Sequence, residues 1–181
     1  GVTIAALTGV ITTSVAISGF GNSTIWLIIC AFLLARGFIK SGLGRRIAFL
    51  IIKAIGKSSL SLGYAITLSD FIISPATPSS TARAGGIIYP IIRSLSSALG
   101  SEPGPTARKF GAYIMQIEYQ ANAITCAMFM TAMAGNPLIV ELAEKTIGVQ
   151  ITWGNWALAA IVPGLLSLLL MPYLLYKLFP P

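Results

Sequence analysis

The sequence has no histidine and very little charge. Charged residues make up 9% of the 181 residues, hydrophobic residues make up 55%, and the mean hydropathy is +0.84. Because a soluble domain carries about 25% charged residues, this composition excludes a soluble globular protein and predicts an all-α integral membrane protein. A spanning helix needs about 20 mostly apolar residues, which leaves room for about four or five membrane-embedded units and for no sizeable soluble domain.

Cysteine is scarce, and charge of one sign dominates. Cys30 and Cys126 both lie inside apolar runs, so we expect small packing residues and no disulfide. The net charge of +7 comes from lysines and arginines that fall between apolar stretches, which is typical of membrane loops. The charge therefore indicates topology and a lipid bilayer as partner, with no nucleic acid. The start at Gly1 in place of Met, and the end at "LFPP" directly after an apolar run, predict a fragment of a longer protein.

Apolar periodicity predicts a chain of helices. Residues 2 to 18 are interpreted as the end of a helix begun upstream, with Ser23 as the N-cap of the next helix. The basic and apolar residues that follow residue 40 predict an amphipathic helix lying along the membrane interface. Complete spans are expected at 24–40 and 152–179, short helical stretches at 59–75 and 82–99, a long run at 110–134, and a short helix to about residue 146.

The positive charges fix the expected topology. Lysines and arginines lie on both sides of residues 58–92, so the positive-inside rule places both flanks in the cytoplasm. Because about 35 residues are too few for two crossings, this segment is predicted to be a re-entrant hairpin. We therefore divide the chain into scaffold-like transmembrane helices plus the interfacial helix at 1–57, the hairpin of a transport domain at 58–100, and a discontinuous helix plus a final span at 101–181.

The stretch "SPATPSST" predicts the hairpin tip. Irregular backbone at membrane depth is tolerated only where it is buried in protein or lines a cavity, and Pro75 and Pro78 end the first arm. Ser79, Ser80 and Thr81 can cap the second arm, whose free N–H groups and positive dipole end suit a carboxylate. Unwound carbonyls and hydroxyls there could also hold a small hard cation.

A second break is expected at "TAMAGNPL", residues 131–138, where a glycine and a proline interrupt the long apolar run. Two discontinuous helices near the middle of a membrane are typical of the binding site of a secondary transporter.

Three ionisable residues lie inside apolar stretches and are functional candidates: Asp70, Arg83 and Glu118. Asp70 and Arg83 sit on opposite arms of the hairpin, and a structural pair is slightly favoured over substrate contact. For Glu118, a proton or cation path and a buried hydrogen-bonded role are equally open.

Two other function classes fit the sequence less well. An intramembrane hydrolase with Ser79 or Ser80 as nucleophile needs a nearby base, but the chain has no histidine and the hairpin has no lysine. A purely structural membrane scaffold leaves both helix breaks unexplained.

The motifs "GFGNSTIWLIICAFLLARGFIKSGLGRRIAFLIIKAIGKSS", "SPATPSSTARAGGIIYP", "MFMTAMAGNPL" and "ITWGNWALAAIVPGLLSLLLMPYLLYKLFPP" resemble the divalent anion/sodium symporter family. The resemblance covers essentially the whole chain and is nearest to the branch of citrate/succinate antiporters and plastid 2-oxoglutarate/malate translocators. It implies a homodimeric, multi-pass transporter of di- and tricarboxylates in a bacterial inner membrane or plastid inner envelope. It further implies two inverted repeats, of which this chain matches the first, and an elevator-like movement.

The resemblance also implies site residues. The family carries a Ser-Asn-Thr signature at each hairpin tip, which binds substrate carboxylates and helps to build a sodium site. Here it matches Ser79-Ser80-Thr81, and the Gly135-Asn136-Pro137 stretch matches the unwound loop that closes the site. Substrate ligands are thus expected at Ser79, Ser80, Thr81, Asn136 and Pro137, and candidate sodium ligands at Ser79, Ser80 and Gly135. Serine in place of the asparagine amide favours an antiporter that needs no cofactor over a sodium-coupled symporter.

Overall fold

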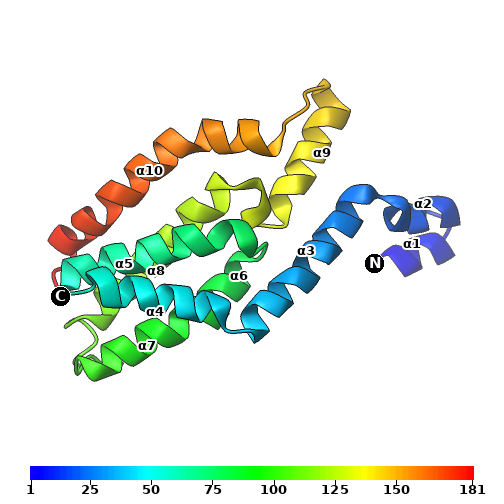
Figure 1. The fold of residues 1–181 in the computed structure, drawn as a ribbon. Helices are drawn as coiled ribbons and strands as arrows, with labels where there is room; N and C mark the ends of the chain where they lie inside the picture. Colours follow the sequence, from blue (N-terminus) through cyan, green and yellow to red (C-terminus); the bar gives the residue numbers. More distant parts are fainter.

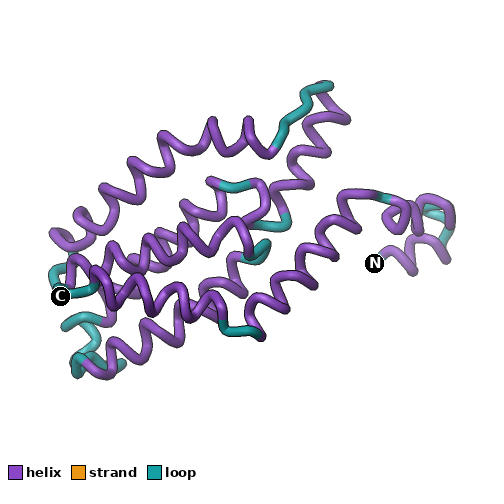
Figure 2. The backbone as a smooth tube through the Cα atoms, viewed as in Figure 1, coloured by secondary structure: helices purple, strands orange, loops and turns teal.

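The computed structural model describes residues 1–181 and is built of helices alone, without a β-strand (Figure 2). The α-helices are α1 (Val2–Leu7), α2 (Thr13–Ile17), α3 (Ser23–Lys40), α4 (Leu43–Ile55), α5 (Ser59–Ile73), α6 (Ser80–Arg83), α7 (Tyr89–Ala98), α8 (Gly111–Met128), α9 (Gly135–Ile147) and α10 (Trp153–Leu178). Shorter segments are the 3₁₀ turns η1 (Ser18–Gly21), η2 (Ser74–Ala76) and η4 (Met130–Ala132), and the π-helical turn η3 (Ala84–Ile88).

The sequence pattern predicted a single helix for the N-terminal apolar run, and the structure does not contain one. The run is divided into α1, α2 and η1, which lie at the outer end of α3 (Figure 1). Gly9 adopts the left-handed conformation at φ +73°, which ends α1 because side-chain-bearing residues disfavour it. Three residues later, Thr12 starts a new helix, since its hydroxyl accepts a hydrogen bond from the Val15 N–H.

The first long helix, α3, begins one residue away from the expected cap. Asn22 is its N-cap, with Oδ1 accepting from the Ile25 N–H at 3.1 Å, and Ser23, the predicted cap, is the first helical residue. An asparagine serves as well as a serine at this position, so the sequence offered two equivalent candidates. Gly42, at φ +68°, is the N-cap of α4 and turns the chain from α3 into it.

The predicted amphipathic helix is confirmed as a helix in α4. It buries Gly44 and Ala48 against its neighbours, while Arg45, Arg46 and Lys53 are exposed. A side chain at Gly44 would lie 2.7 Å from Phe38 and 2.9 Å from Ile87, so the missing Cβ lets α4 approach both α3 and the hairpin.

The core lies around α5, which packs against α4, α8 and α10 (Figure 1). Isoleucines from the hairpin and from α8 fill it, together with Tyr113. Gly63 permits a close approach, because a Cβ there would stand 2.5 Å from Ile117 and 2.6 Å from the Tyr113 hydroxyl. This close packing fixes the position of the hairpin on α8.

The second arm of the hairpin contains the π turn η3. In this turn the Tyr89 N–H donates to the carbonyl of Ala84, five residues earlier. Pro90, the second residue of α7, explains the wider turn, because its ring would clash with the carbonyl of the residue four positions back, Gly86, in a regular helix. The arm therefore runs as one helical path from Ser80 to Ala98.

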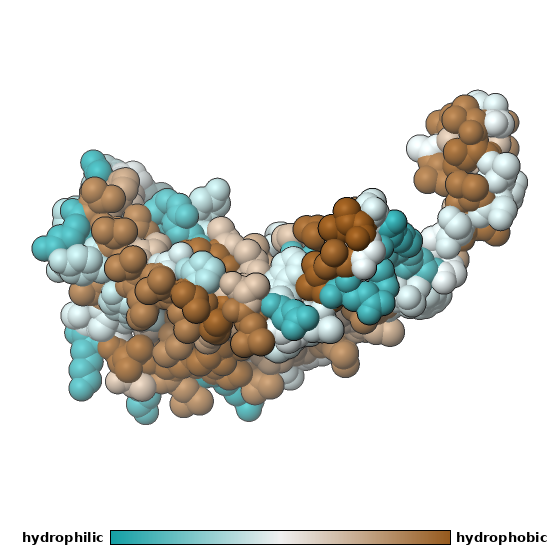
Figure 3. All heavy atoms as spheres, turned by 90° about the horizontal axis from the view of Figure 1, so that it is seen from above, coloured by the Kyte–Doolittle hydropathy of each residue, from teal (hydrophilic) through white to brown (hydrophobic).

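Two helices, α3 and α10, are long and apolar enough to cross a membrane. Only 6% and 22% of their most apolar windows are buried within the chain, so they are not core helices of a soluble fold. The space-filling view shows apolar side chains over much of the surface (Figure 3). Such a surface is suited to lipid and to packing against further protein.

Candidate functional site

The two arms of the hairpin are joined by an irregular tip. After α5 and η2, Thr77 and Ser79 have extended backbone conformations, and helix resumes at Ser80. Ser79 is the N-cap, with its hydroxyl oxygen accepting from the Ala82 N–H at 3.2 Å. The predicted serine cap is therefore present, with Ser79 in the capping position.

The tip differs from the preceding helix in how its hydroxyls are used. Thr67, Ser69 and Ser74 in α5 and η2 each donate to a carbonyl of their own helical turn. Ser80 and Thr81 make no side-chain hydrogen bond within the chain; Ser80 is partly exposed and Thr81 is exposed. The first turn of the second arm thus presents two free hydroxyls, together with the positive end of a helix.

A buried ion pair lies directly beneath the tip. Arg83 Nε donates to Asp70 Oδ1 at 2.7 Å, and both side chains are 0% exposed. The pair ties the two arms together, which agrees with the structural role favoured from the sequence. Because neither side chain reaches the surface, this conformation offers no direct substrate contact at either of them.

The ion pair belongs to a larger hydrogen-bond network. Arg83 also donates to the carbonyls of Thr77 and Ala132, both at 3.3 Å, and to the Thr125 hydroxyl at 3.1 Å. Thr125 in turn donates to Asp70 Oδ2. Charges buried in this way are tolerated because most of their remaining donors and acceptors have partners. The network joins α5, the tip, α8 and η4 into one unit.

The second break is also present, but its start differs from the prediction. Helix α8 ends at Met128, and η4 and two extended residues precede α9. Gly135, Asn136 and Pro137 were expected to interrupt a helix, whereas they begin α9. A proline is tolerated in a first turn because the N–H it lacks would have no intrahelical partner.

Asn136 has a definite role at this break. It is 3% exposed, and its Nδ2 donates to the carbonyls of Cys126 and Phe129 at 2.8 and 3.0 Å. These carbonyls belong to the end of α8, where helix termini need external donors. Asn136 therefore fastens the start of α9 to the end of α8, a function that the sequence did not reveal.

The hairpin tip and the break lie against each other. The Thr131 hydroxyl donates to the Pro75 carbonyl at 2.9 Å, and Arg83 bonds Ala132 across the same contact. No hydrogen bond joins Ser79, Ser80 or Thr81 directly to Gly135–Pro137. The chain thus brings two predicted irregular segments together through the residues beside them.

The candidate sodium ligands lie on both irregular segments, Ser79 and Ser80 at the hairpin tip and Gly135 at the start of α9. Apart from its chain neighbours and its own helix backbone, a Cβ at Gly135 would meet only Met133, at 3.2 Å. The carbonyls of Thr77 and Ala132, which face the contact between the two breaks, already accept from Arg83. No group of three or more acidic, histidine or cysteine side chains is placed to hold a metal ion.

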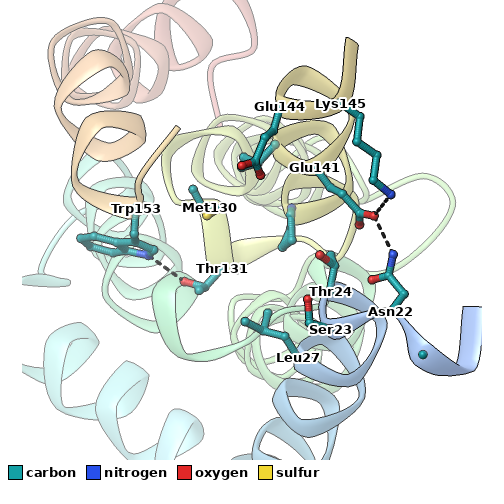
Figure 4. A pocket seen from close by; sticks show the side chains of 13 residues that line it. Asn22, Ser23, Thr24, Leu27, Met130, Thr131, Glu141, Glu144, Lys145 and Trp153 are labelled. Carbon is teal, nitrogen blue, oxygen red and sulfur yellow. Dashed lines mark hydrogen bonds and ion pairs between the residues drawn. The ribbon is translucent and has the colours of Figure 1, made fainter. Parts of the chain in front are cut away.

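A cavity of about 620 Å³ opens beside the second break, between the starts of α3 and α10 and the outer face of α9 (Figure 4). Glu141 Oε1 accepts from Asn22 Nδ2 at 2.6 Å and from Lys145 Nζ at 2.5 Å on its wall. Pro137 lines the cavity, as do Thr131 and Trp153, while the serines of the hairpin tip do not. Asn22 and Glu141 carry no local signal of this site in the sequence, because they meet only through a contact between residues 119 positions apart.

Glu118, the third predicted intramembrane charge, stands apart. It lies on α8 with 6% exposure, and neither carboxylate oxygen has a hydrogen-bond partner. The buried hydrogen-bonded role considered from the sequence is therefore not what the structure contains.

Two irregular helix breaks in contact within an apolar, all-helical chain are typical of membrane transport proteins. Comparison with known proteins agrees, because the family model for the sodium:sulfate symporter transmembrane region matches residues 1–181. The chain belongs to this family, the divalent anion/sodium symporters, which are integral membrane transporters and not enzymes.

Individual relatives are similar over nearly the whole chain. A Bacillus subtilis (strain 168) protein to which malate transport is attributed is 56% identical over 98% of the chain and 37% of its own length. Dicarboxylate transporter 1 of Spinacia oleracea chloroplasts is 50% identical over 100% of the chain and 32% of its own length. The L-tartrate/succinate antiporter of Escherichia coli (strain UTI89 / UPEC) is 46% identical over 92% of the chain and 34% of its own length. The chain thus spans about a third of the length of these relatives.

Proposed function

We propose that this chain is one half of a secondary transporter that exchanges dicarboxylates and tricarboxylates of the 2-oxoglutarate, malate, succinate and citrate class. The observation that carries the proposal is the pair of free hydroxyls at Ser80 and Thr81 on the first turn of the second hairpin arm. The relatives named for dicarboxylate transport and for tartrate/succinate antiport support this substrate class.

The geometry suggests how a carboxylate would be held. The first backbone N–H groups of the arm and the two hydroxyls are donors, and the helix end adds a partial positive charge. Arg83 lies one turn further along, and its pairing with Asp70 leaves the tip without a full positive charge. A site built of neutral donors binds a dicarboxylate loosely enough to release it, as exchange requires.

The remaining parts of the proposal concern the whole protein. Residues 58–100 form a re-entrant hairpin in a transport domain, and residues 1–57 form part of a scaffold against which it moves as an elevator. A second, inverted repeat supplies the other half of the substrate site, and Ser79, Asn136 and Pro137 complete the half built here. The protein is a multi-pass homodimer in a bacterial inner membrane or plastid inner envelope.

Thr81→Val in the full-length transporter tests the tip, because valine keeps the shape and removes the hydroxyl. Reconstituted into liposomes preloaded with a dicarboxylate, the variant should take up labelled malate with reduced apparent affinity; one lost hydrogen bond to a charged group corresponds to about 1.5–3 kcal/mol, or roughly 10- to 150-fold. Thr146→Val is the matched control, since its exposed hydroxyl bonds only the Leu142 carbonyl of its own helix.

Unchanged affinity in Thr81→Val would refute a tip that contacts the carboxylate. Uptake into empty vesicles that requires sodium would identify a sodium-coupled symporter instead of an exchanger. The family description names sodium coupling, so this second candidate is measured in the same assay.

A further inference from the structure

Glu118 has an unusual environment for an acid. It is 6% exposed, and both carboxylate oxygens are buried without any partner. Asn122 and Thr125 follow at spacings of four and seven residues, which places all three on one face of α8. That face meets the Asp70–Arg83 pair, since Asn122 Nδ2 lies 3.4 Å from Asp70 Oδ1 and Thr125 donates to Asp70 Oδ2.

The nearby cation is already neutralised. Asp70 of α5 and Arg83 of α6 are the charged groups that act on Glu118 across this face, and they pair with each other at 2.7 Å. Four of the five N–H groups of Arg83 have partners in Asp70, Thr77, Ala132 and Thr125. The second N–H on Nη2 is the one donor of Arg83 that has no partner within the chain.

The other helices that pack against α8 bring no compensating charge. In α10 the only charged residue, Lys177, lies over the ring of Tyr173 at 5.7 Å. In α7 the only charged residue, Arg93, pairs with Glu102 at 2.6 Å. The turns η3 and η4 contain no charged residue.

An ionised carboxylate in such a place would lack both hydrogen bonds and a counter-ion. The cost of burying it unpaired far exceeds the stability of a domain, so the group takes up a proton instead. The neutral carboxylic acid is compatible with the surroundings of Glu118. The ionised carboxylate becomes compatible only after a rearrangement that brings water, or the fifth N–H of Arg83, to its oxygens.

We propose that Glu118 is a proton-binding site coupled to anion exchange, so that the transporter carries a proton together with the more highly charged anion. In the conformation described here the carboxyl holds its proton. When the hairpin network opens, the O–H bond breaks, the proton passes to water on the side that the site then faces, and the bonding electron pair stays on the carboxylate. This inference rests on the proposed exchange function, and it explains how a tricarboxylate could be exchanged for a dicarboxylate without net charge movement.

The test uses the full-length transporter in proteoliposomes that enclose a pH-sensitive dye. With external citrate and internal succinate, the wild type should move protons in proportion to labelled citrate taken up, and its exchange should depend on pH. In Glu118→Gln, which imitates the protonated acid, the number of protons moved per citrate should fall to the background of protein-free liposomes. Glu102→Gln removes an exposed carboxyl instead and should keep the wild-type ratio. A wild-type ratio in Glu118→Gln would overturn the proposal.

Infrared spectroscopy provides a measurement that does not depend on transport. The wild type at neutral pH should show the carbonyl stretch of a protonated carboxylic acid, and Glu118→Gln should lose that band. If Glu118→Gln does not fold, a titration of the wild type alone decides, because the absence of any protonated-acid band at neutral pH would overturn the proposal. A wild type that shows the band yet exchanges no dicarboxylate would contradict the proposed function, but it would not contradict a proton bound at Glu118.

Discussion

The buried Asp70–Arg83 pair allows a quantitative test of what holds the hairpin on α8. In Asp70→Asn the side chain keeps its shape, but the Arg83 guanidinium, which is 0% exposed, loses its counter-ion. Removing one partner of a buried ion pair costs about 3–5 kcal/mol, because the other charge remains buried and uncompensated. The equilibrium constant for unfolding should therefore rise roughly 150- to 4000-fold.

The measurement is chemical unfolding of the detergent-solubilised full-length transporter, followed by tryptophan fluorescence. Arg83→Gln should be similarly destabilising, while the double variant Asp70→Asn/Arg83→Gln should cost clearly less than the sum of the two, because no charge is left buried. Glu102→Gln is the matched control, since it breaks an ion pair of similar length, 2.6 Å, whose side chains are 40% and 47% exposed. The reasoning is refuted if Asp70→Asn loses no more stability than Glu102→Gln, or if the two single effects simply add.

Two further outcomes follow from single side chains. Asn136→Ala should cost about 1–3 kcal/mol in the same unfolding assay, since it removes the side-chain donor to two carbonyls at the end of α8, of which only that of Phe129 keeps a backbone donor, the Ala132 N–H; the exposed Asn155→Ala should change little, and equal effects would contradict the role of Asn136. The Ser97 hydroxyl and then the Arg93 guanidinium hold the pKa of the Glu102 carboxyl below its usual value. This stabilisation is complete above the unfolded-state pKa and is lost as the pH falls through the lower folded-state pKa, so the unfolding midpoints of the wild type and Glu102→Gln should converge in acid and differ at neutral pH.

The composition and the proline positions were enough to predict a helical membrane chain, the irregular hairpin tip and the break near residue 131. At the tip they succeeded because Pro75 and Pro78 lack the N–H that a continuing helix would need, although Pro163 and Pro172 lie inside α10. The pairing of Asp70 with Arg83 was also accessible, since two opposite charges in apolar surroundings have few alternatives to each other.

Other features depend on contacts that no local pattern contains. Gly135 and Pro137 were placed inside the break, yet they begin α9, because a first turn tolerates proline and Asn136 supplies donors to the end of α8. The apolar run at 2–18 was expected to be one helix, and the left-handed Gly9 divides it. The direction in which Glu118 points, and its lack of partners, are set by the packing of α8 against the hairpin.

The π turn η3 sets the rotational alignment of the hairpin tip. A π turn holds one residue more than the same stretch of α-helix, and each residue of an α-helix turns the chain by about 100°. The arm beyond Tyr89 is anchored in the core by Ile91 and Ile92, so the extra residue determines which way Arg83 and the two free hydroxyls face. A relative that lacked this one residue would have the same tip sequence turned by more than a quarter of a revolution, with its arginine out of reach of Asp70. Chain length between the core and the tip therefore sets the direction in which the tip faces, whichever residues the tip carries.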